Sequence, residues 1–440
     1  MKREVFIVEH EKRLVLFAPL KGLILEINAY EKNKVETIIN QSKFSLEYLL
    51  DIFPELDQDR LLSLKIEPRE VTRDEKEFYP DSAVLFTTFD CGLRCVYCYS
   101  KAGEQKINMS QQIAKAVVDF IIRNAKTKGK ASSSLGFHGG GEPTWNWDVF
   151  SFALTYFQEK AREYGIIPEV ELATNGMLSK KQINWIIQHM KTVQVSLDGV
   201  EEIHDFQRPT AGNGKSFAVV FNTAKTLLVN GVQLVLHCVI TEKGADRIPE
   251  IVRFFGSNFP NTTVHLEPSY QCGRGLVTGQ KSPSAEQFVK GFIEAQEIAK
   301  TYNIDLIYSG ASPKLTELHL GFCGVSNPNF VVTPTGLVTA CHEVDGPNHL
   351  LANHFIYGHL DYSSQEFVFD SKKIQVLRDH VGDVNLECQE CFAKFYCAGD
   401  CLVKRINNEK GGDLLALNFR CKINKELARR YIFSQLTNLT

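Results

Sequence analysis

The sequence predicts an α/β fold built on a parallel sheet, either an open doubly wound sheet or a partial barrel. From Ser82 to about Ser269, apolar runs of strand length alternate with amphipathic stretches of helical spacing. Chemically active residue types stand at the ends of these runs, where parallel α/β folds place their active sites. Six strands are expected, over residues 83–89, 133–139, 169–175, 192–198, 232–240 and 262–268. Helices are expected over 111–125, 180–190, 216–230 and, beyond the repeats, 284–302.

Residues 1–66 form a separate N-terminal unit in this scheme, and the charged residues 67–81 form a linker. Short apolar runs at 5–10, 13–18 and 22–27 predict three strands, and helical spacing of apolar residues over 33–41, 45–53 and 57–65 predicts three helices. This order resembles the winged-helix peptide-recognition element of peptide-modifying systems, and residues 14–39 resemble the peptide chaperone of pyrroloquinoline quinone synthesis. The alternative is a β-extension that packs on the next domain.

Composition indicates an ordinary soluble protein. The chain has 440 residues, 44% of them hydrophobic, and a net charge of −3. No basic excess suggests nucleic acid, and no stretch approaches the roughly 18 uncharged apolar residues of a membrane span. The N-terminus lacks the unbroken apolar core of a signal peptide. We therefore expect a cytoplasmic protein that binds neither nucleic acid nor membrane.

Twelve cysteines are unusual for such a chain, and they are clustered. Three lie within Cys91–Cys98 and seven lie between Cys323 and Cys421, so that only Cys238 and Cys272 stand outside the two groups. Disulfides are rare in cytosolic proteins, where clustered cysteines more often bind metal.

The first group, Cys91, Cys95 and Cys98, directly follows the first strand of the repeats. Three thiolates so spaced can hold three corners of a 4Fe-4S cluster and leave the fourth iron open. A zinc site normally needs four protein ligands. The spacing, with an aromatic residue before the last cysteine, resembles the signature of the radical S-adenosylmethionine (SAM) superfamily. The resemblance implies that the repeats form a partial (β/α)6 TIM-like barrel over residues 82–320, including a bridging region.

The same resemblance implies roles for residues at the strand ends. A glycine-rich turn after the second strand is expected to offer backbone carbonyls and Glu142 to the SAM ammonium, and the fourth strand and the segment after it to hold the SAM carboxylate. The expected cofactor-binding residues are Tyr97, Gly140, Gly141, Glu142, Ser196 and Arg208. His138 and Glu267 end the second and sixth strands, and each is a candidate catalytic residue, as a substrate contact, or a structural support. Arg208 could instead form a surface ion pair.

The second group has a spacing that resembles the seven-cysteine SPASM extension, which carries auxiliary iron–sulfur clusters. Its domain is expected over residues 321–440, and zinc is the alternative for its closely spaced pairs. The family pattern assigns one four-thiolate cluster to Cys388, Cys391, Cys397 and Cys421. It assigns a second cluster to Cys323, Cys341 and Cys401, whose fourth position is either open or filled by Cys272 or a non-cysteine residue. SAM and three 4Fe-4S clusters are therefore the expected cofactors.

The resemblance implies a radical enzyme that abstracts a hydrogen atom from a ribosomally made precursor peptide and installs a C–C, thioether or ether cross-link. A leader segment would bind the N-terminal unit, and a flavodoxin or ferredoxin-type protein would supply electrons. An anaerobic sulfatase-maturating enzyme is the alternative, although that branch has an aspartate where this chain has His342, directly after Cys341. An iron–sulfur electron carrier or peptide-binding scaffold is a third possibility, which has no need of an open iron.

Overall fold

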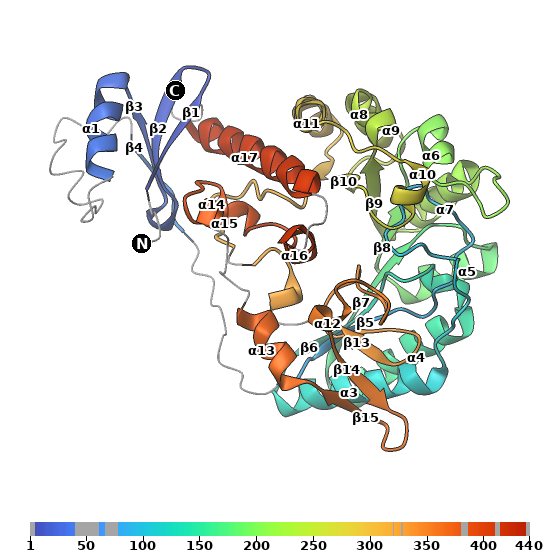
Figure 1. Cartoon of the computed structure of the whole chain (residues 1–440). Coiled ribbons are helices and arrows are strands. Elements are labelled where there is room, and N and C mark those ends of the chain that lie inside the picture. Colours follow the sequence, from blue (N-terminus) through green and yellow to red (C-terminus); the bar gives the residue numbers. More distant parts are fainter. Residues whose placement is uncertain are drawn as a thin grey trace. The chain divides into compact units, whose positions relative to one another are not determined.

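A computed structural model describes residues 5–39, 61–66, 78–319, 321–326, 329–379, 386–409 and 414–436. The chain divides into two compact units (Figure 1). The smaller unit contains residues 1–74, 309–323 and 379–440, and the larger unit contains 75–308 and 324–378. Each unit is described by itself below.

The larger unit is built on a long sheet with the strand order β11-β10-β9-β8-β7-β6-β5-β12-β13-β14-β15. Strands β5 to β11 are all parallel, and each pairs with its neighbour in chain order. Their bounds are Ser82–Leu85, Ser132–Phe137, Ile167–Thr174, Thr192–Ser196, Gln233–Ile240, Thr263–Pro268 and Asp305–Ile307. The six expected strands are all present, so the predicted α/β fold with a parallel sheet is confirmed.

Helices alternate with these strands and cover one face of the sheet (Figure 1). Fully buried strand residues such as Val195, Leu236 and Leu266 alternate with half-buried ones, so the two faces have different surroundings. Helices α5 and α11 begin with reciprocal capping boxes, Ser179 with Gln182 and Ser284 with Gln287. The helix bounds are α3 Gln111–Thr127, α4 Trp147–Glu163, α5 Lys180–His189, α6 Glu201–Gln207, α7 Phe217–Val229, α8 Glu242–Ala245, α9 Ile248–Asn258, α10 Arg274–Thr278 and α11 Ala285–Thr301, with a 3-10 turn η3 at Pro143–Trp145.

Four short strands extend the sheet beyond β5. Strand β12 (Val331–Val332) is parallel to β5, and β13 (Leu337–Thr339), β14 (Ile356–Asp361) and β15 (Glu366–Phe369) follow as an antiparallel meander. Aromatic side chains of this region, including Phe330, Phe367 and Phe369, pack with Phe120 of α3. The rest of this region is η4 (Gly324–Ser326), α12 (Ala352–Phe355) and α13 (Ser371–Asp379).

The smaller unit contains a four-stranded antiparallel sheet in the order β1-β2-β3-β4, with bounds Phe6–His10, Arg13–Ala18, Leu23–Ile27 and Leu61–Ser63. A 3-10 turn, η1 (Pro19–Lys21), connects β2 to β3. Helix α1 (Ala29–Ile39) packs Val35 on one face of this sheet, against a cluster that includes Leu16, Leu25 and Ile27.

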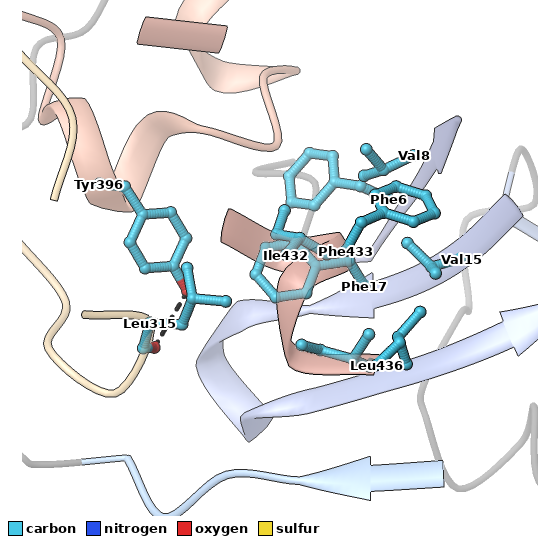
Figure 2. Close-up of a cluster of buried hydrophobic side chains, with 10 residues drawn as sticks. Phe6, Val8, Val15, Phe17, Leu315, Tyr396, Ile432, Phe433 and Leu436 are labelled. Carbon is cyan, nitrogen blue, oxygen red and sulfur yellow. Dashed lines mark hydrogen bonds between the residues drawn. The ribbon is translucent and has the colours of Figure 1, made fainter. Parts of the chain in front are cut away.

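The other face of the small sheet packs against the C-terminal helix α17 (Leu414–Leu436). Figure 2 shows this cluster, in which Phe6 and Phe17 lie beside Ile432 and Phe433. The Tyr396 hydroxyl donates a hydrogen bond of 3.2 Å to the Leu315 carbonyl at its edge. The other helices of this unit are α14 (Leu386–Gln389), α15 (Lys394–Cys397) and α16 (Leu402–Glu409). The N-terminal and C-terminal segments of the chain therefore share one core.

Of the three helices expected in the N-terminal unit, the first corresponds to α1, and the second, over 45–53, lies outside the described residues. The third, over 57–65, is wrong where it is described, because residues 61–63 form β4. Leu62 and Leu64 alternate with polar residues and pack against the cluster of Figure 2, and β4 pairs with the open edge of β3. In the part of the chain that the structure describes, no helix combines the length and the apolar character needed to cross a membrane.

Candidate functional site

The loop after β5 carries the first three cysteines at the carboxyl edge of the parallel sheet. Cys91 is buried, and Cys95 and Cys98 pack in the same small cluster with Leu93 and Met177. The Sγ of Cys91 accepts hydrogen bonds from the Leu93 amide at 3.4 Å and from the Asn175 side-chain amide at 3.5 Å. Amide donors to cysteine sulfur are typical of iron–sulfur sites, where they tune the reduction potential.

Burial and the mutual repulsion of the sulfurs raise the pKa of the Cys91 thiol to about 12. Burial also raises the pKa of Cys95 to about 11, although the Arg208 charge opposes this increase. One guanidinium nitrogen of Arg208 lies 3.9 Å from the Cys95 Sγ. Buried thiolates need a cation to stabilise them, so three grouped sulfurs with these donors fit a cationic iron cluster.

The glycine-rich turn after β6 packs tightly on the segment before Cys91. Gly139 and Gly140 have φ angles of 91° and 65°, a region that favours glycine. A Cβ on Gly141 would collide with the Asp90 carbonyl, and the Gly141 amide donates to the Thr88 carbonyl at 2.8 Å. The Gly140 carbonyl accepts a hydrogen bond of 2.6 Å from Ser100, close to Cys98. The turn and the cysteine loop therefore hold each other in place.

Glu142 is buried and fully engaged by hydrogen bonds at the start of η3. Its carboxylate accepts from the Thr144 hydroxyl at 2.6 Å, the Thr174 hydroxyl at 2.7 Å and the Asn175 amide at 2.7 Å. Burial raises the pKa of this carboxyl, and these donors oppose the increase. Glu142 thus ties the glycine-rich turn to the end of β7 and is held in one orientation.

Asp198, just after β8, organises the other side of the cysteine loop. Its Oδ2 accepts hydrogen bonds from the Tyr97 hydroxyl at 2.5 Å, the Gln207 amide at 2.7 Å and the Arg208 Nε at 2.9 Å. Burial raises the pKa of Asp198, but the Arg208 charge, the nearby His204 and the hydrogen bonds from Arg208 and Tyr97 together outweigh burial and lower the pKa. Arg208 is 5% exposed, so its ion pair is internal and the surface alternative is wrong.

The Arg208 guanidinium also lies 5.4 Å from the centre of the Tyr97 ring. Asp198 therefore fixes Tyr97 and Arg208, two of the side chains predicted to bind SAM. Tyr97 directly precedes Cys98, and Arg208 lies beside Cys95. Ser196, half-buried at the end of β8, pairs with His237 of β9 in the sheet register.

His138 follows β6, and its ring centre lies 5.0 Å from the ring of His342. Burial lowers the pKa of both, that of His342 to about 3. Burial and the nearby Cys98, Glu343 and Cys341 groups raise the pKa of Tyr99 well above its usual range. The segment from Cys341 therefore lies near both His138 and the end of the first cysteine loop.

Glu267 lies at the end of β10, and its Oε1 is 2.8 Å from the Nε2 of His265 on the same strand. The His265 ring stands edge-on to the ring of His237, with centres 5.2 Å apart. Sequence reasoning selected Glu267 but missed His265, whose position two residues earlier on the same strand face was the available signal.

The C-terminal cysteines of the smaller unit lie close enough together to influence one another's ionisation. Burial raises the pKa of Cys388, Cys397 and Cys421, and the charges of Cys388 and Cys391 contribute to these shifts. Beside them, Asp400 and Arg420 form a buried ion pair with a shortest distance of 2.9 Å, and Asn424 donates to Asp400 at 2.8 Å. Among the described residues no set of three or more side chains has the geometry of a metal site, so the four-thiolate cluster that the family pattern implies stays a prediction.

The predicted set Cys323, Cys341 and Cys401 is divided between the units, with Cys341 in the larger one, and it stays a prediction. Cys238 is completely buried in β9, as expected for a packed thiol. Cys272 lies in the larger unit, and the next residue, Gly273, packs directly on the backbone of Cys98 and Tyr99.

The chain is similar in sequence to known proteins. The sequence model of the Radical SAM superfamily matches residues 85–255. The chain is similar to the cysteine-type anaerobic sulfatase-maturating enzyme of Clostridium perfringens, with 22% identity over 363 residues that cover 79% of this chain and 95% of the relative.

Two solved structures have a similar fold. One is native anSMEcpe with bound AdoMet and the Cp18Cys peptide, with a TM-score of 0.63, 20% identity and coverage of 81% of this chain and 98% of that one. The other is SuiB of Streptococcus suis bound to the precursor peptide SuiA, with a TM-score of 0.51, 16% identity and coverage of 92% and 96%.

Proposed function

We propose, from the premise that this chain carries a radical SAM domain, that it oxidises a side chain of a peptide or protein substrate. The observation that supports this most is the cysteine loop held between the glycine-rich turn and the Asp198 network. When bound, SAM and a 4Fe-4S cluster would supply a 5′-deoxyadenosyl radical that removes a hydrogen atom from an unactivated carbon.

In this proposal Cys91, Cys95 and Cys98 hold the iron. Backbone carbonyls of Gly140 and Gly141 with Glu142 bind the SAM ammonium, because a buried carboxylate fixed by its own donors offers negative charge in one place. Ser196 and Arg208 bind the SAM carboxylate, and Tyr97 lies against the adenine. Asp198 compensates the charge of the buried Arg208 and holds its guanidinium in one orientation, which a flexible surface arginine would lack.

The substrate class that the comparisons favour is a sulfatase, in which a cysteine or serine is oxidised to formylglycine. A sulfatase-maturating relative is matched over 95% of its length, and the fold of native anSMEcpe is matched over 98% of its chain. These matches cover 79% and 81% of this chain, which leaves about a fifth of it outside.

Cross-linking of a ribosomally made precursor peptide is the second candidate, and two observations favour it. The residue after Cys341 is His342 where the sulfatase-maturating branch has an aspartate. The chain also has a small sheet with outer strands β1 and β4, to which a leader peptide could add as a further strand. SuiB, which was solved with the precursor peptide SuiA, covers 92% of this chain.

Two auxiliary 4Fe-4S clusters complete the proposal, one at Cys388, Cys391, Cys397 and Cys421 and one at Cys323, Cys341 and Cys401. They would accept the electron that the substrate gives up, and a flavodoxin or ferredoxin-type protein of the cytoplasm would deliver electrons to the first cluster.

A separate experiment tests leader binding by the small sheet. If this sheet binds the leader, a labelled precursor peptide that is attached to the full chain by a chemical cross-linker should be attached at β1.

Co-expression with each short peptide and each sulfatase encoded beside the gene tests the proposal. Formylglycine formation from cysteine replaces sulfur by oxygen and also removes two hydrogen atoms, whereas a cross-link removes two hydrogen atoms and keeps the sulfur, so mass spectrometry separates these two products. Release of 5′-deoxyadenosine without any change in a partner would contradict the peptide or protein substrate.

A further inference from the structure

A row of polar side chains crosses three neighbouring strands on the face of the sheet opposite the helices. The parallel register places Ser196 of β8 beside His237 of β9, and His237 beside His265 of β10. Glu267 follows on the same face of β10. We call Ser196, His237, His265 and Glu267 the polar row. It begins at the residue proposed to bind the SAM carboxylate, so its far end lies near the reacting centre.

His265 and Glu267 form an imidazole–carboxylate dyad. Glu267 Oε1 lies 2.8 Å from His265 Nε2, and the two side chains are 17% and 25% exposed. A carboxylate at this distance holds the imidazole as the tautomer with hydrogen on Nε2, which leaves Nδ1 with an open lone pair. Among the described residues, none hydrogen-bonds to that Nδ1. This is the arrangement by which a carboxylate orients a histidine base.

His237 supports the dyad from the neighbouring strand without competing for its proton. Burial, reinforced by the proximity of His265, lowers the pKa of His237 to about 3, so this ring is neutral near pH 7. The other charged groups around the dyad are Asp198, just after β8, Arg208, just after α6, and Asp305 of β11, which pairs with Thr263 on the same face.

The proposed reaction needs a base. Hydrogen-atom abstraction converts the adenosyl radical to 5′-deoxyadenosine and leaves a carbon radical on the substrate. This radical becomes a closed-shell product by giving an electron to an iron–sulfur cluster of the enzyme and a proton to a base. The balance is the same for formylglycine formation, through a carbon–sulfur double bond, and for closure of a new carbon–sulfur bond.

We propose that His265, oriented by Glu267, is the base that accepts the proton released when the substrate radical is oxidised. This inference rests on the proposed function. His265 acts on the substrate, and Glu267 is a positioning residue that acts through it. The dyad gives the chain a proton acceptor in a site whose Cys341 is not followed by a carboxylate.

The first test needs no substrate. Diethylpyrocarbonate acylates accessible, unprotonated imidazole nitrogen, and mass spectrometry of the reconstituted full chain locates the product. His265 should react, and bound SAM should protect it because Ser196 begins the same row. His359, exposed on β14, is the matched internal control. An unreacted His265 in chains whose His359 has reacted would overturn the inference.

The second test uses the Cp18Cys peptide and the variants His265→Gln, Glu267→Gln and His359→Gln. His265→Gln should slow product formation about 10²-fold while 5′-deoxyadenosine formation stays within about twofold of wild type. In the wild-type enzyme, the pH profile of product formation should show an ionisation that the profile of 5′-deoxyadenosine formation lacks. His265→Gln should remove that ionisation. Glu267→Gln should show the same separation to a smaller degree, and free imidazole should restore product formation in His265→Ala.

Equal loss of product and 5′-deoxyadenosine in His265→Gln would assign a structural role to His265, and an unchanged rate and pH profile would exclude it as the base. Failure of the wild-type enzyme to alter the Cp18Cys peptide would count against formylglycine formation, while the acylation experiment would still show whether His265 is an accessible, unprotonated imidazole that SAM protects.

Discussion

The loop of Cys91, Cys95 and Cys98 spans residues 91–98, whereas the C-terminal group of Cys388, Cys391, Cys397 and Cys421 spans residues 388–421. The first group is local and grows out of one strand of the parallel sheet. The second is assembled from the short helices α14 and α15 and the long helix α17. A compact motif can thus be recognised from spacing alone, and a dispersed one depends more on the fold around it.

Both groups are nevertheless stabilised by the same device, a buried aspartate–arginine pair. Asp198 pairs with Arg208 next to Cys95, and Asp400, which directly precedes Cys401, pairs with Arg420, which directly precedes Cys421. The Cys401 amide donates to Asp400 at 2.6 Å. The pairs span 10 and 20 positions of the chain, and each one holds in place a segment that lies next to a cysteine.

The largest expected effect comes from removing the cysteines of the first loop while the C-terminal group is left intact. The triple change of Cys91, Cys95 and Cys98 to Ala should abolish 5′-deoxyadenosine formation, because no other set of described residues is proposed to bind SAM. Reconstituted wild-type protein should hold about twelve irons and the variant about eight, as expected for loss of a single cube. Iron analysis and chromatography of the nucleoside check this. Continued SAM cleavage by the triple variant would overturn the assignment of the first loop.

Replacing the aspartate of each ion pair by the neutral asparagine tests whether each aspartate stabilises its own cysteine group. Asp198→Asn leaves a buried Arg208 charge uncompensated, which should lower the free energy of unfolding of the larger unit by about 3–5 kcal/mol. SAM affinity should fall, while the C-terminal group keeps its iron. Asp400→Asn should have the opposite pattern, with loss of C-terminal iron and preserved SAM binding, as measured by equilibrium dialysis and iron analysis.

The matched control is Arg247→Gln, which removes a partly exposed network with Glu202 and Glu250. This change should cost only about 0–1 kcal/mol. Equal losses of iron from both groups in either aspartate variant would show that the pairs stabilise the chain as a whole.

The parallel sheet and the cysteine motifs could be predicted from sequence because both depend on short-range order. Strand residues such as Val193 and Val195 alternate with polar neighbours, and the spacing from Cys91 to Cys98 is fixed along the chain. The role of Asp198 could not be predicted, since Tyr97 is 101 positions away and the hydrogen bond between them depends on the closed fold.

The small sheet illustrates the other limit. Residues 61–63 lack the context within their own segment that would favour a strand over a helix, and the edge of β3 decides between the two. The pairing of Asp400 with Arg420 was missed for the same reason, because the cysteine pattern assigns no role to either residue and the two meet only when α17 packs.

A smaller effect should follow from His204, which is buried beside Asp198 in the larger unit. Its Nδ1 accepts from the Asp198 amide at 3.2 Å and its Nε2 lies 3.1 Å from the Ser216 hydroxyl. Burial lowers the pKa of His204 from 6.5 to about 4. The unfolded chain therefore binds a proton more readily, so stability is full above a pH of about 6.5 and falls as the pH decreases toward 4.

The free energy of unfolding of the wild-type chain decreases between a pH of about 7.5 and 5. In His204→Gln, whose side chain is neutral, this decrease should be smaller by about 2 kcal/mol. Denaturant unfolding at both pH values measures it. Other buried histidines, His237 and His342, contribute in the same direction, so only the difference between variant and wild type identifies His204. An unchanged pH dependence would mean that His204 has the same pKa in the folded and the unfolded chain.

The smallest expected effect concerns Cys272, beside the first loop but outside both cysteine groups. The family pattern gives the set of Cys323, Cys341 and Cys401 no fourth thiolate, and an open iron there could bind a substrate thiolate as well as accept an electron. If that site is open, Cys272→Ala should leave iron at about twelve per chain, and substrate should alter the spectrum of the cluster.

The neighbouring Gly273→Ala provides the contrast for this nearly silent change. Gly273 has a φ of 48° and a ψ of −120°, and an added Cβ would collide with the carbonyl oxygens of Cys98 and Tyr99. This variant should therefore disturb the first loop and reduce 5′-deoxyadenosine formation, although it removes no possible ligand. If Cys272→Ala instead loses about four irons, Cys272 is a ligand, the auxiliary site is closed, and the cluster is an electron relay that cannot bind substrate sulfur.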